Sequence, residues 1–370
     1  MKTILLVGIL GIVFLSGCSN QPIQESSSTE MTSESLSTAP STTESEETEE
    51  ITVLAENLTI PWAIEKNGET FYVSERGGTI AKITDGKVER QKVDLAEPLS
   101  DAAEAGFMGF VLSEDFDESQ TAYGYYTYEN SATFSRVIQL KLEENQWKET
   151  NVLLDQIPAG SFHHGGRLKI GPDKKLYATV GDALDEERAQ EETSLTGKIL
   201  RMNLDGSIPE DNPFADSYVY SYGHRNPQGL AWGEDGQIYA SEHGDSANDE
   251  INEIEAGKNY GWPVIQGNQT QTGMRKPLFT SGSDQTWAPS GMAYHEDNLY
   301  VAALRGTAVL EVNSPGKKVT ERLTEYGRIR DIYIMEDQLY FVTNNSDGRG
   351  TPNENDDRLV QVPLTRLATE

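Results

Sequence analysis

One local pattern recurs along most of the chain: a turn rich in Asp, Asn or Gly is followed by a short strand centred on a tyrosine. GEDGQIYASEHGD (233–245) is a typical copy, and five more lie between residues 66 and 345. Short aromatic runs bounded by turn residues predict β-strands, and no long amphipathic helical pattern interrupts them. The tyrosines that mark the six copies are Tyr72, Tyr123, Tyr177, Tyr239, Tyr300 and Tyr340.

The spacing of these tyrosines limits the fold. Successive markers are 51, 54, 62, 61 and 40 residues apart. Periods of about 40–50 residues, lengthened by loop insertions, are typical of β-propellers, in which each repeat is one blade of several strands. Six markers therefore predict an all-β, six-bladed propeller of four-stranded blades. The runner-up interpretation is a stack of two β-sandwiches.

The two ends of the folded part suit a closed ring. Residues 51–54 predict a first strand and residues 358–362 a last one. If both belong to one blade, the ring closes and no strand edge stays free. A single domain over 51–370 is permitted at this length. Because equivalent propeller loops converge at one end of a central channel, polar residues beside the marker strands are expected to meet there.

The first 17 residues are expected to be a secretion signal. Lys2 precedes an apolar run from Ile4 to Leu15, which is too short for a comfortable membrane span. Residues 15–18, LSGC, resemble the lipobox of bacterial lipoproteins, in which the cysteine is lipidated and becomes the N-terminus. Cys18 is the only cysteine, so no intrachain disulfide can form. We expect a lipid anchor at Cys18 on the extracytoplasmic face of the cell membrane; the alternative is an ordinary secreted protein.

Residues 18–50 are expected to be a disordered tether behind the lipidated cysteine. Their Ser, Thr and Glu side chains cannot offset the entropy cost of ordering the chain. Without the eight Glu of this tether and Lys2 of the signal, 52 acidic and 29 basic side chains remain, a net charge of −23. Such a surface repels nucleic acid and anionic lipid. Nucleic acid is therefore excluded as a partner, and membrane contact is expected only through the lipid anchor.

The run from Tyr220 to Pro263 places two polar clusters at the ends of one predicted hairpin. The strands LAW (230–232) and QIYAS (237–241) are joined by the turn EDG (234–236). GHRNPQG (223–229) precedes the strands, and EHGD (242–245) and NDE (248–250) follow them. Oxygen-rich loops kinked by glycine suit a hard cation such as Ca²⁺. The hairpin is expected to form one wall of a ligand pocket, the alternative being ordinary surface turns.

Two further segments carry side chains suited to chemistry. His163 precedes the third marker strand and Asp182 follows it, so a hydrogen bond between them would orient the imidazole and raise its basicity. Arg328 and Arg330 share one face of a predicted strand and suit a ligand with several carboxylates. The alternatives are a structural histidine and two surface arginines matched to nearby acids.

These segments resemble motifs of the soluble pyrroloquinoline-quinone-dependent aldose sugar dehydrogenases, the glucose/sorbosone dehydrogenase family. The similarity runs from about residue 54 to the last strand, and that family is a six-bladed propeller. The resemblance implies oxidation of aldose sugars at the anomeric carbon by hydride transfer to pyrroloquinoline quinone, with electrons passed to an external acceptor. The similar segments are IPWAI (60–64), HHGGRLKIGPDKKLYATVGD (163–182), LTGKILRMNLDGSIPEDNPF (195–214), YSYGHRNPQGL (220–230), SEHGDSANDEIN (241–252), NYGWP (259–263) and GRIRD (327–331).

The resemblance also implies roles for single residues. His163 matches the general base that takes the proton from the anomeric hydroxyl, and Asp182 matches the acid that orients it. Arg225 and Asn226 match residues that contact the quinone oxygens, where a cation stabilises developing negative charge. The other residues that match cofactor-binding positions are Glu104, Arg305, Arg328 and Arg330. The backbone carbonyls of Gly244 and Asp245 match the ligands of a catalytic Ca²⁺, which polarises the quinone. Glu250 and Tyr260 match a second, structural Ca²⁺ site.

The sequence departs from the family pattern at four positions. Glu104 stands where the best-known members have Gln, and Asp245 where Pro is common. His164, to which no catalytic role is assigned, stands where Asn is frequent, and Arg305 where relatives can have Lys. The loops that choose the sugar match poorly, so the resemblance implies no particular sugar, electron acceptor or oligomeric state.

Other functions are weighed against this one. The chain has no Gly-rich nucleotide fingerprint between a strand and a helix, which argues against a nicotinamide enzyme. One alternative is a non-catalytic, calcium-stabilised propeller that binds a surface glycan or a protein. The other is a calcium-dependent lactone hydrolase, which would need carboxylates in place of the arginine pair.

Overall fold

The structure, a computed structural model, describes residues 50–313 and 317–367. The predicted secretion signal, Cys18 and all of the tether except its last residue lie outside the described residues. The helices of the described part are short: α1 (Phe116–Ser119), α2 (Leu364–Leu367) and two 3₁₀ turns at 186–190 and 324–326. None of these helices is long and apolar enough to cross a membrane. The all-β prediction is confirmed.

The strands follow one another in antiparallel runs of four. The first two runs are β2 (Pro61–Asn67), β3 (Thr70–Glu75), β4 (Thr79–Thr84) and β5 (Lys87–Asp94), then β6 (Phe107–Leu112), β7 (Thr121–Glu129), β8 (Thr133–Glu143) and β9 (Gln146–Pro158). The next two are β10 (Leu168–Ile170), β11 (Leu176–Val180), β12 (Lys198–Met202) and β13 (Val219–Tyr222), then β14 (Pro227–Trp232), β15 (Ile238–Glu242), β16 (Glu250–Ile254) and β17 (Phe279–Thr280). The last two are β18 (Pro289–His295), β19 (Asn298–Ala303), β20 (Ala308–Asn313) and β21 (Lys318–Arg322), then β22 (Ile329–Met335), β23 (Gln338–Thr343), β24 (Leu359–Pro363) and β1 (Thr52–Ala55).

The repeat seen in the sequence corresponds to these runs. Each marker tyrosine lies in the second strand of its run: in β3, β7, β11, β15, β19 and β23. The predicted pairing of the first and last strands is confirmed, because β1 pairs with β24 through Thr52 with Gln361 and Val53 with Val360. The first two runs join into one eight-stranded sheet where β5 and β9 pair in parallel. The sequence did not predict this junction.

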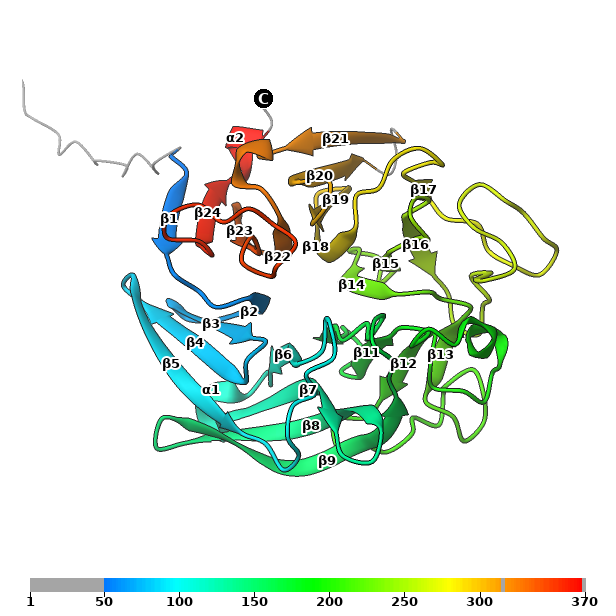
Figure 1. The fold of residues 1–370 in the computed structure, drawn as a ribbon, viewed down its shortest axis with the longest axis horizontal. Coiled ribbons are helices and arrows are strands. Elements are labelled where there is room, and N and C mark those ends of the chain that lie inside the picture. Colours follow the sequence, from blue (N-terminus) through cyan, green and yellow to red (C-terminus); the bar gives the residue numbers. More distant parts are fainter. Residues whose placement is uncertain (1–49, 314–316, 368–370) are drawn as a thin grey trace, which may run out of the picture. The chain divides into compact units, whose positions relative to one another are not determined.

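The first strands of the runs lie next to one another (Figure 1). β2 contacts β6, β6 contacts β10, β14 contacts β18, and β18 contacts β22, which in turn contacts β2. Between the third and fourth runs, β11 contacts β14. This arrangement is consistent with a β-propeller; two stacked sandwiches would not bring β22 against β2.

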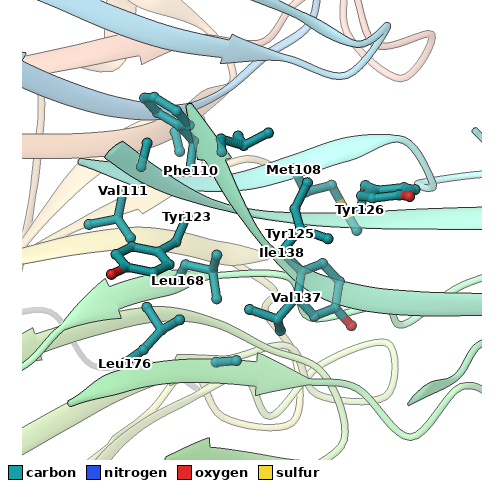
Figure 2. Close-up of a cluster of buried hydrophobic side chains, with 14 of the residues drawn as sticks. Met108, Phe110, Val111, Tyr123, Tyr125, Tyr126, Val137, Ile138, Leu168 and Leu176 are labelled. Carbon is teal, nitrogen blue, oxygen red and sulfur yellow. The ribbon is translucent and has the colours of Figure 1, made fainter. Parts of the chain in front are cut away.

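The largest core cluster fixes the second run against the third. Figure 2 shows Phe110 and Val111 of β6 and Tyr123 of β7 near Leu168 of β10 and Leu176 of β11. All five side chains are buried, and burying a large apolar side chain contributes about 1.5–3 kcal/mol.

A glycine permits a close backbone approach at the same junction. A side-chain carbon at Gly109 would lie 2.3 Å from the carbonyl oxygen of Gly166, so only glycine fits there. β6 therefore packs tightly against the loop that leads into β10, which carries His163 and His164.

Candidate active site

His163 lies in the loop before β10 and is held against Asp182, which follows β11. Its Nδ1 is 2.7 Å from Oδ1 of Asp182, so the predicted hydrogen bond is present. A side-chain carbon at Gly181 would lie 2.0 Å from the carbonyl oxygen of His163, so glycine is required between strand and acid. Because a carboxylate only accepts, the imidazole proton resides on Nδ1, and Nε2 is left as a proton acceptor.

Asp182 is itself fixed by three further hydrogen bonds. The indole N–H of Trp262 donates to Oδ2 at 2.8 Å, and the backbone N–H of Leu184 donates to Oδ1 at 2.9 Å. Its own N–H donates to the carbonyl of Arg225 at 2.8 Å. The side chain of Asp182 is 2% exposed, so its orientation, and with it that of the His163 ring, is set by buried partners.

A pocket lies beside the loop that carries His163. Three arginines, Arg76, Arg330 and Arg349, line it, and Glu104 is the one carboxylate among its lining residues. Burial lowers the pKa of Arg330 to about 9, although the nearby Asp347 opposes this shift. The pocket thus carries an excess of positive charge and suits an anionic ligand. The other lining residues are Trp62, Met108, His164, Gly165, Gln228, His243 and Leu304.

The predicted arginine pair converges on an acid that the sequence interpretation did not include. Nη2 of Arg328 is 2.7 Å and Nη2 of Arg330 is 3.9 Å from Oδ2 of Asp347, whose side chain is 3% exposed. Arg330 also donates to Oε1 of Gln228 at 2.9 Å. Nε of Arg328 is buried and finds no hydrogen-bond partner among the described residues. Arg305 is exposed and lines a neighbouring pocket together with Arg328.

Glu104 reaches the site from the loop between β5 and β6. It forms an ion pair with Arg349 and faces the backbone N–H of His163 at 3.4 Å. Burial alone would raise the pKa of Glu104, but the hydrogen bond and charge of Arg349 outweigh it and lower the pKa to about 2. The carboxylate is therefore ionised at any ordinary pH, and Arg349 neutralises it.

Arg225 and Asn226 lie on the other side of the His163 loop. Oδ1 of Asn226 accepts from the N–H of Gly165 at 3.0 Å. The Arg225 guanidinium lies 5.2 Å from the ring centroid of Trp262, and its Nη2 is 3.4 Å from the exposed carboxylate of Asp245. Its Nε is buried without a hydrogen-bond partner in the described part of the chain.

These contacts bring several predicted residues together. Asp182 hydrogen-bonds both His163 and the backbone of Arg225, and Glu104 faces the backbone of His163. Arg330 shares a pocket with Glu104. Asp245 adjoins this group through its ion pair with Arg225, and Arg328 adjoins it through Asp347, which it shares with Arg330. Arg305 and Gly244 line neighbouring pockets.

A second pocket is lined by three of the four predicted calcium-site residues. Gly244, Glu250 and Tyr260 line it together with Glu242. Burial and the charge of Glu242 raise the pKa of Glu250 to about 8. Among the described residues no group of three or more His, Cys, Asp or Glu side chains is placed to hold a metal. The calcium assignment therefore stays a prediction.

The family is decided by comparison with known proteins. The glucose/sorbosone dehydrogenase family model matches residues 58–353. The chain belongs to this family. The aldose sugar dehydrogenase YliI of Escherichia coli is 31% identical over 80% of this chain and 91% of its own. Quinoprotein glucose dehydrogenase B of Acinetobacter calcoaceticus is 30% identical over 61% of this chain and 52% of its own. The solved pyrroloquinoline-quinone-bound aldose sugar dehydrogenase of Streptomyces coelicolor is 35% identical, with a TM-score of 0.78 over 84% of this chain and 97% of that chain.

In this member of the glucose/sorbosone dehydrogenase family, the structure adds site residues that sequence reasoning missed. Trp262 belongs to the matched motif NYGWP, but its bond to Asp182 was not foreseen. His243 lines both pockets, and burial lowers its pKa to about 4, so its ring is neutral. Asp347 and Arg349 lie in the loop between β23 and β24, a segment without any matched motif. No signal in the matched motifs pointed to these two residues.

Proposed function

We propose that this protein is an aldose sugar dehydrogenase that oxidises sugars at the anomeric carbon with pyrroloquinoline quinone as cofactor and passes the electrons to an external acceptor. Membership of the glucose/sorbosone dehydrogenase family supports sugar oxidation. The cofactor is suggested by the Streptomyces enzyme, solved with this quinone, and by the Acinetobacter quinoprotein. The observation that carries the proposal is the His163–Asp182 pair beside a pocket with three arginines and one carboxylate.

The residues present fit such a cofactor. A quinone with several carboxylates needs cationic, hydrogen-bond-donating partners. The buried Nε atoms of Arg225 and Arg328 have no partner among the described residues, and each is a donor that a ligand oxygen would satisfy. We assign the cofactor to Arg225, Asn226 and Arg330, with Arg328 and Arg305 toward the rim. When bound, the quinone supplies the acceptor for the hydride and its two electrons.

The chain's own residues handle the proton. His163 Nε2 takes the proton of the anomeric hydroxyl, and Asp182 stabilises the resulting imidazolium through Nδ1. Trp262 and the backbone of Leu184 keep the carboxylate in place. Arg225 places positive charge where negative charge develops on the acceptor side.

Calcium is part of the proposal. We assign it to the backbone carbonyls of Gly244 and Asp245 and to a second site at Glu250 and Tyr260. Glu250 fits a cation because its raised pKa reflects a buried acid beside Glu242 without enough compensating positive charge.

The finer points of fold and location belong to the same proposal. Runs of four strands and the pairing of β1 with β24 support six blades and a closed ring.

Lipidation of Cys18 would hold residues 51–370 on the extracytoplasmic face of the cell membrane through the tether 18–50. Replacing Cys18 with alanine should move the protein from the membrane to the soluble fraction.

Reconstitution tests the function. The purified protein is mixed with pyrroloquinoline quinone, Ca²⁺, a panel of aldoses and an electron-accepting dye. Sugar-dependent dye reduction is expected, and none is expected when the quinone is omitted. Cofactor binding without turnover on any aldose, or no binding at all, would favour the glycan- or protein-binding alternative. Hydrolysis of a lactone without the quinone would favour the hydrolase.

A further inference from the structure

The Glu104–Arg349 ion pair bridges two loops that are far apart in the sequence. Glu104 lies between β5 and β6, and Arg349 lies between β23 and β24. The second carboxylate oxygen of Glu104 faces the N–H of His163. The Arg349 guanidinium lies 5.7 Å from the ring centroid of Phe162, the residue before His163. The bridge therefore crosses the pocket beside the proposed base.

The two partners differ in how firmly they are held. The side chain of Glu104 is 21% exposed and that of Arg349 is 48% exposed. The other two lining arginines are tied to the protein: Arg330 donates to Gln228 at 2.9 Å and Arg76 donates to the carbonyl of Ala105 at 3.1 Å. Arg349 is the most accessible of the three, so it can change partner at the lowest cost in lost contacts.

Arg349 also occupies the boundary between two pockets. It lines the first with Arg330 and the neighbouring one with Arg305 and Arg328. An anion that enters either pocket meets this guanidinium, and in the first pocket it also meets the negative charge of Glu104. The anion and Glu104 therefore compete for one cation.

We propose that Arg349 is a further cofactor-binding residue and that Glu104 is its competing counter-ion, which Arg349 leaves for a carboxylate of the quinone. This inference rests on the proposed function. The β23–β24 loop then contacts the quinone directly through Arg349. Glu104 weakens quinone binding, because it competes with the quinone for Arg349.

Two single substitutions have opposite expected effects. Arg349→Gln should weaken quinone binding by about tenfold, because a charge-assisted contact is lost and the charge of Glu104 is left uncompensated. Glu104→Gln should tighten binding several-fold, because it removes a negative charge and frees Arg349.

The double variant separates binding from mere neutralisation. If Arg349 only neutralises Glu104, its loss has no effect once Glu104 is Gln. If Arg349 binds the ligand, Arg349→Gln still weakens binding about tenfold in the Glu104→Gln background. The dissociation constant of pyrroloquinoline quinone is measured by titration calorimetry on the calcium-loaded full chain. Equal affinities of E104Q and E104Q/R349Q would overturn the inference.

Controls keep the outcomes distinct. Arg275→Gln removes a similarly exposed arginine that pairs with Glu255 away from these pockets, and it should leave affinity unchanged. Arg349→Lys keeps the charge and should bind more tightly than R349Q; equal binding would count against a charge contact.

If the unmodified protein binds no quinone, the proposed function fails and this inference with it. If it binds and R349Q binds equally well, this inference alone fails.

Discussion

The candidate base depends on one hydrogen bond. Because Nδ1 of His163 donates to Asp182, the opposite nitrogen is free to accept a proton, and the Asp182 carboxylate has no freedom to turn away from the ring. The chemistry of this residue is thus set by groups that themselves touch no substrate. Glu104 is likewise controlled by a neighbour, because Arg349 lowers its pKa and keeps its carboxylate ionised.

Removal of the base should separate turnover from binding. In His163→Ala, we expect kcat to fall by about 10²–10⁴-fold, the range typical of general-base catalysis. Quinone affinity should hardly change, since the arginines that bind it are intact. Steady-state rates and calorimetric titration measure the two quantities. His295→Ala, which replaces a histidine at the end of β18, is the control; normal turnover by H163A would mean that another group takes the proton.

The acid sensitivity of the fold should change with Glu104. Its folded-state pKa of about 2 lies below the ordinary value of 4.5. A lowered carboxyl pKa contributes stability that is present above the unfolded pKa and is lost as the pH falls through the folded pKa. The melting temperature of the unmodified protein should therefore exceed that of Glu104→Gln at pH 5, with the gap narrowing between pH 4.5 and 2. A gap that stays constant would show that the pair with Arg349 is not ionic.

At the scale of elements, the strands were predictable because their signals are local. Turn residues followed by a tyrosine-centred run marked the second strand of every four-strand run. The β5–β9 junction was not predictable, because it arises from pairing between strands of different runs and no sequence period encodes it.

The same distinction applies to the site. His163 and Asp182 flank one hairpin, so their contact followed from spacing. Glu104 and Arg349 are 245 residues apart in the sequence. Only the assembled sheets bring their side chains together, so the ion pair could not be predicted from spacing. Asp347 was missed for a different reason: no matched motif covers the loop between β23 and β24, from which it pairs with Arg328 and with Arg330 of β22.

The start of β16 should respond to calcium through Glu250. Its pKa is raised to about 8 by burial and by Glu242, so its contribution to stability is present below the unfolded pKa and is lost as the pH rises through 8. A bound cation would offset that loss. Calcium should therefore raise the melting temperature more at pH 9 than at pH 6, and Glu250→Gln should reduce this difference. Glu253→Gln, on the same strand but exposed, is the control; a difference between pH 9 and pH 6 that is unchanged in E250Q would show that no cation binds at Glu250.

At the scale of the whole molecule, the proposed ring joins its ends through backbone pairing rather than through a disulfide, since Cys18 is the only cysteine. β1 completes the sheet of β22, β23 and β24. Two residue pairs beyond β1 also link the start of the domain to the last loop. The N–H of Asn57 donates to the carbonyl of Asn355, and Leu58 and Asp357 each donate a backbone N–H to the carbonyl of the other. The contribution of closure can therefore be isolated from these links.

A chain that begins at Glu56 lacks β1 but keeps both links, whereas a chain that begins at Glu50 keeps everything. The shorter chain should melt several degrees lower, because β24 loses its partner strand and the buried contacts of Ala55 are lost. It should also self-associate, since the freed edge of β24 presents unpaired backbone groups. Calorimetry and light scattering on the two chains measure these effects. Equal melting temperatures would mean that the last three strands hold their sheet without the first, and that pairing of the ends adds nothing to the stability of the propeller.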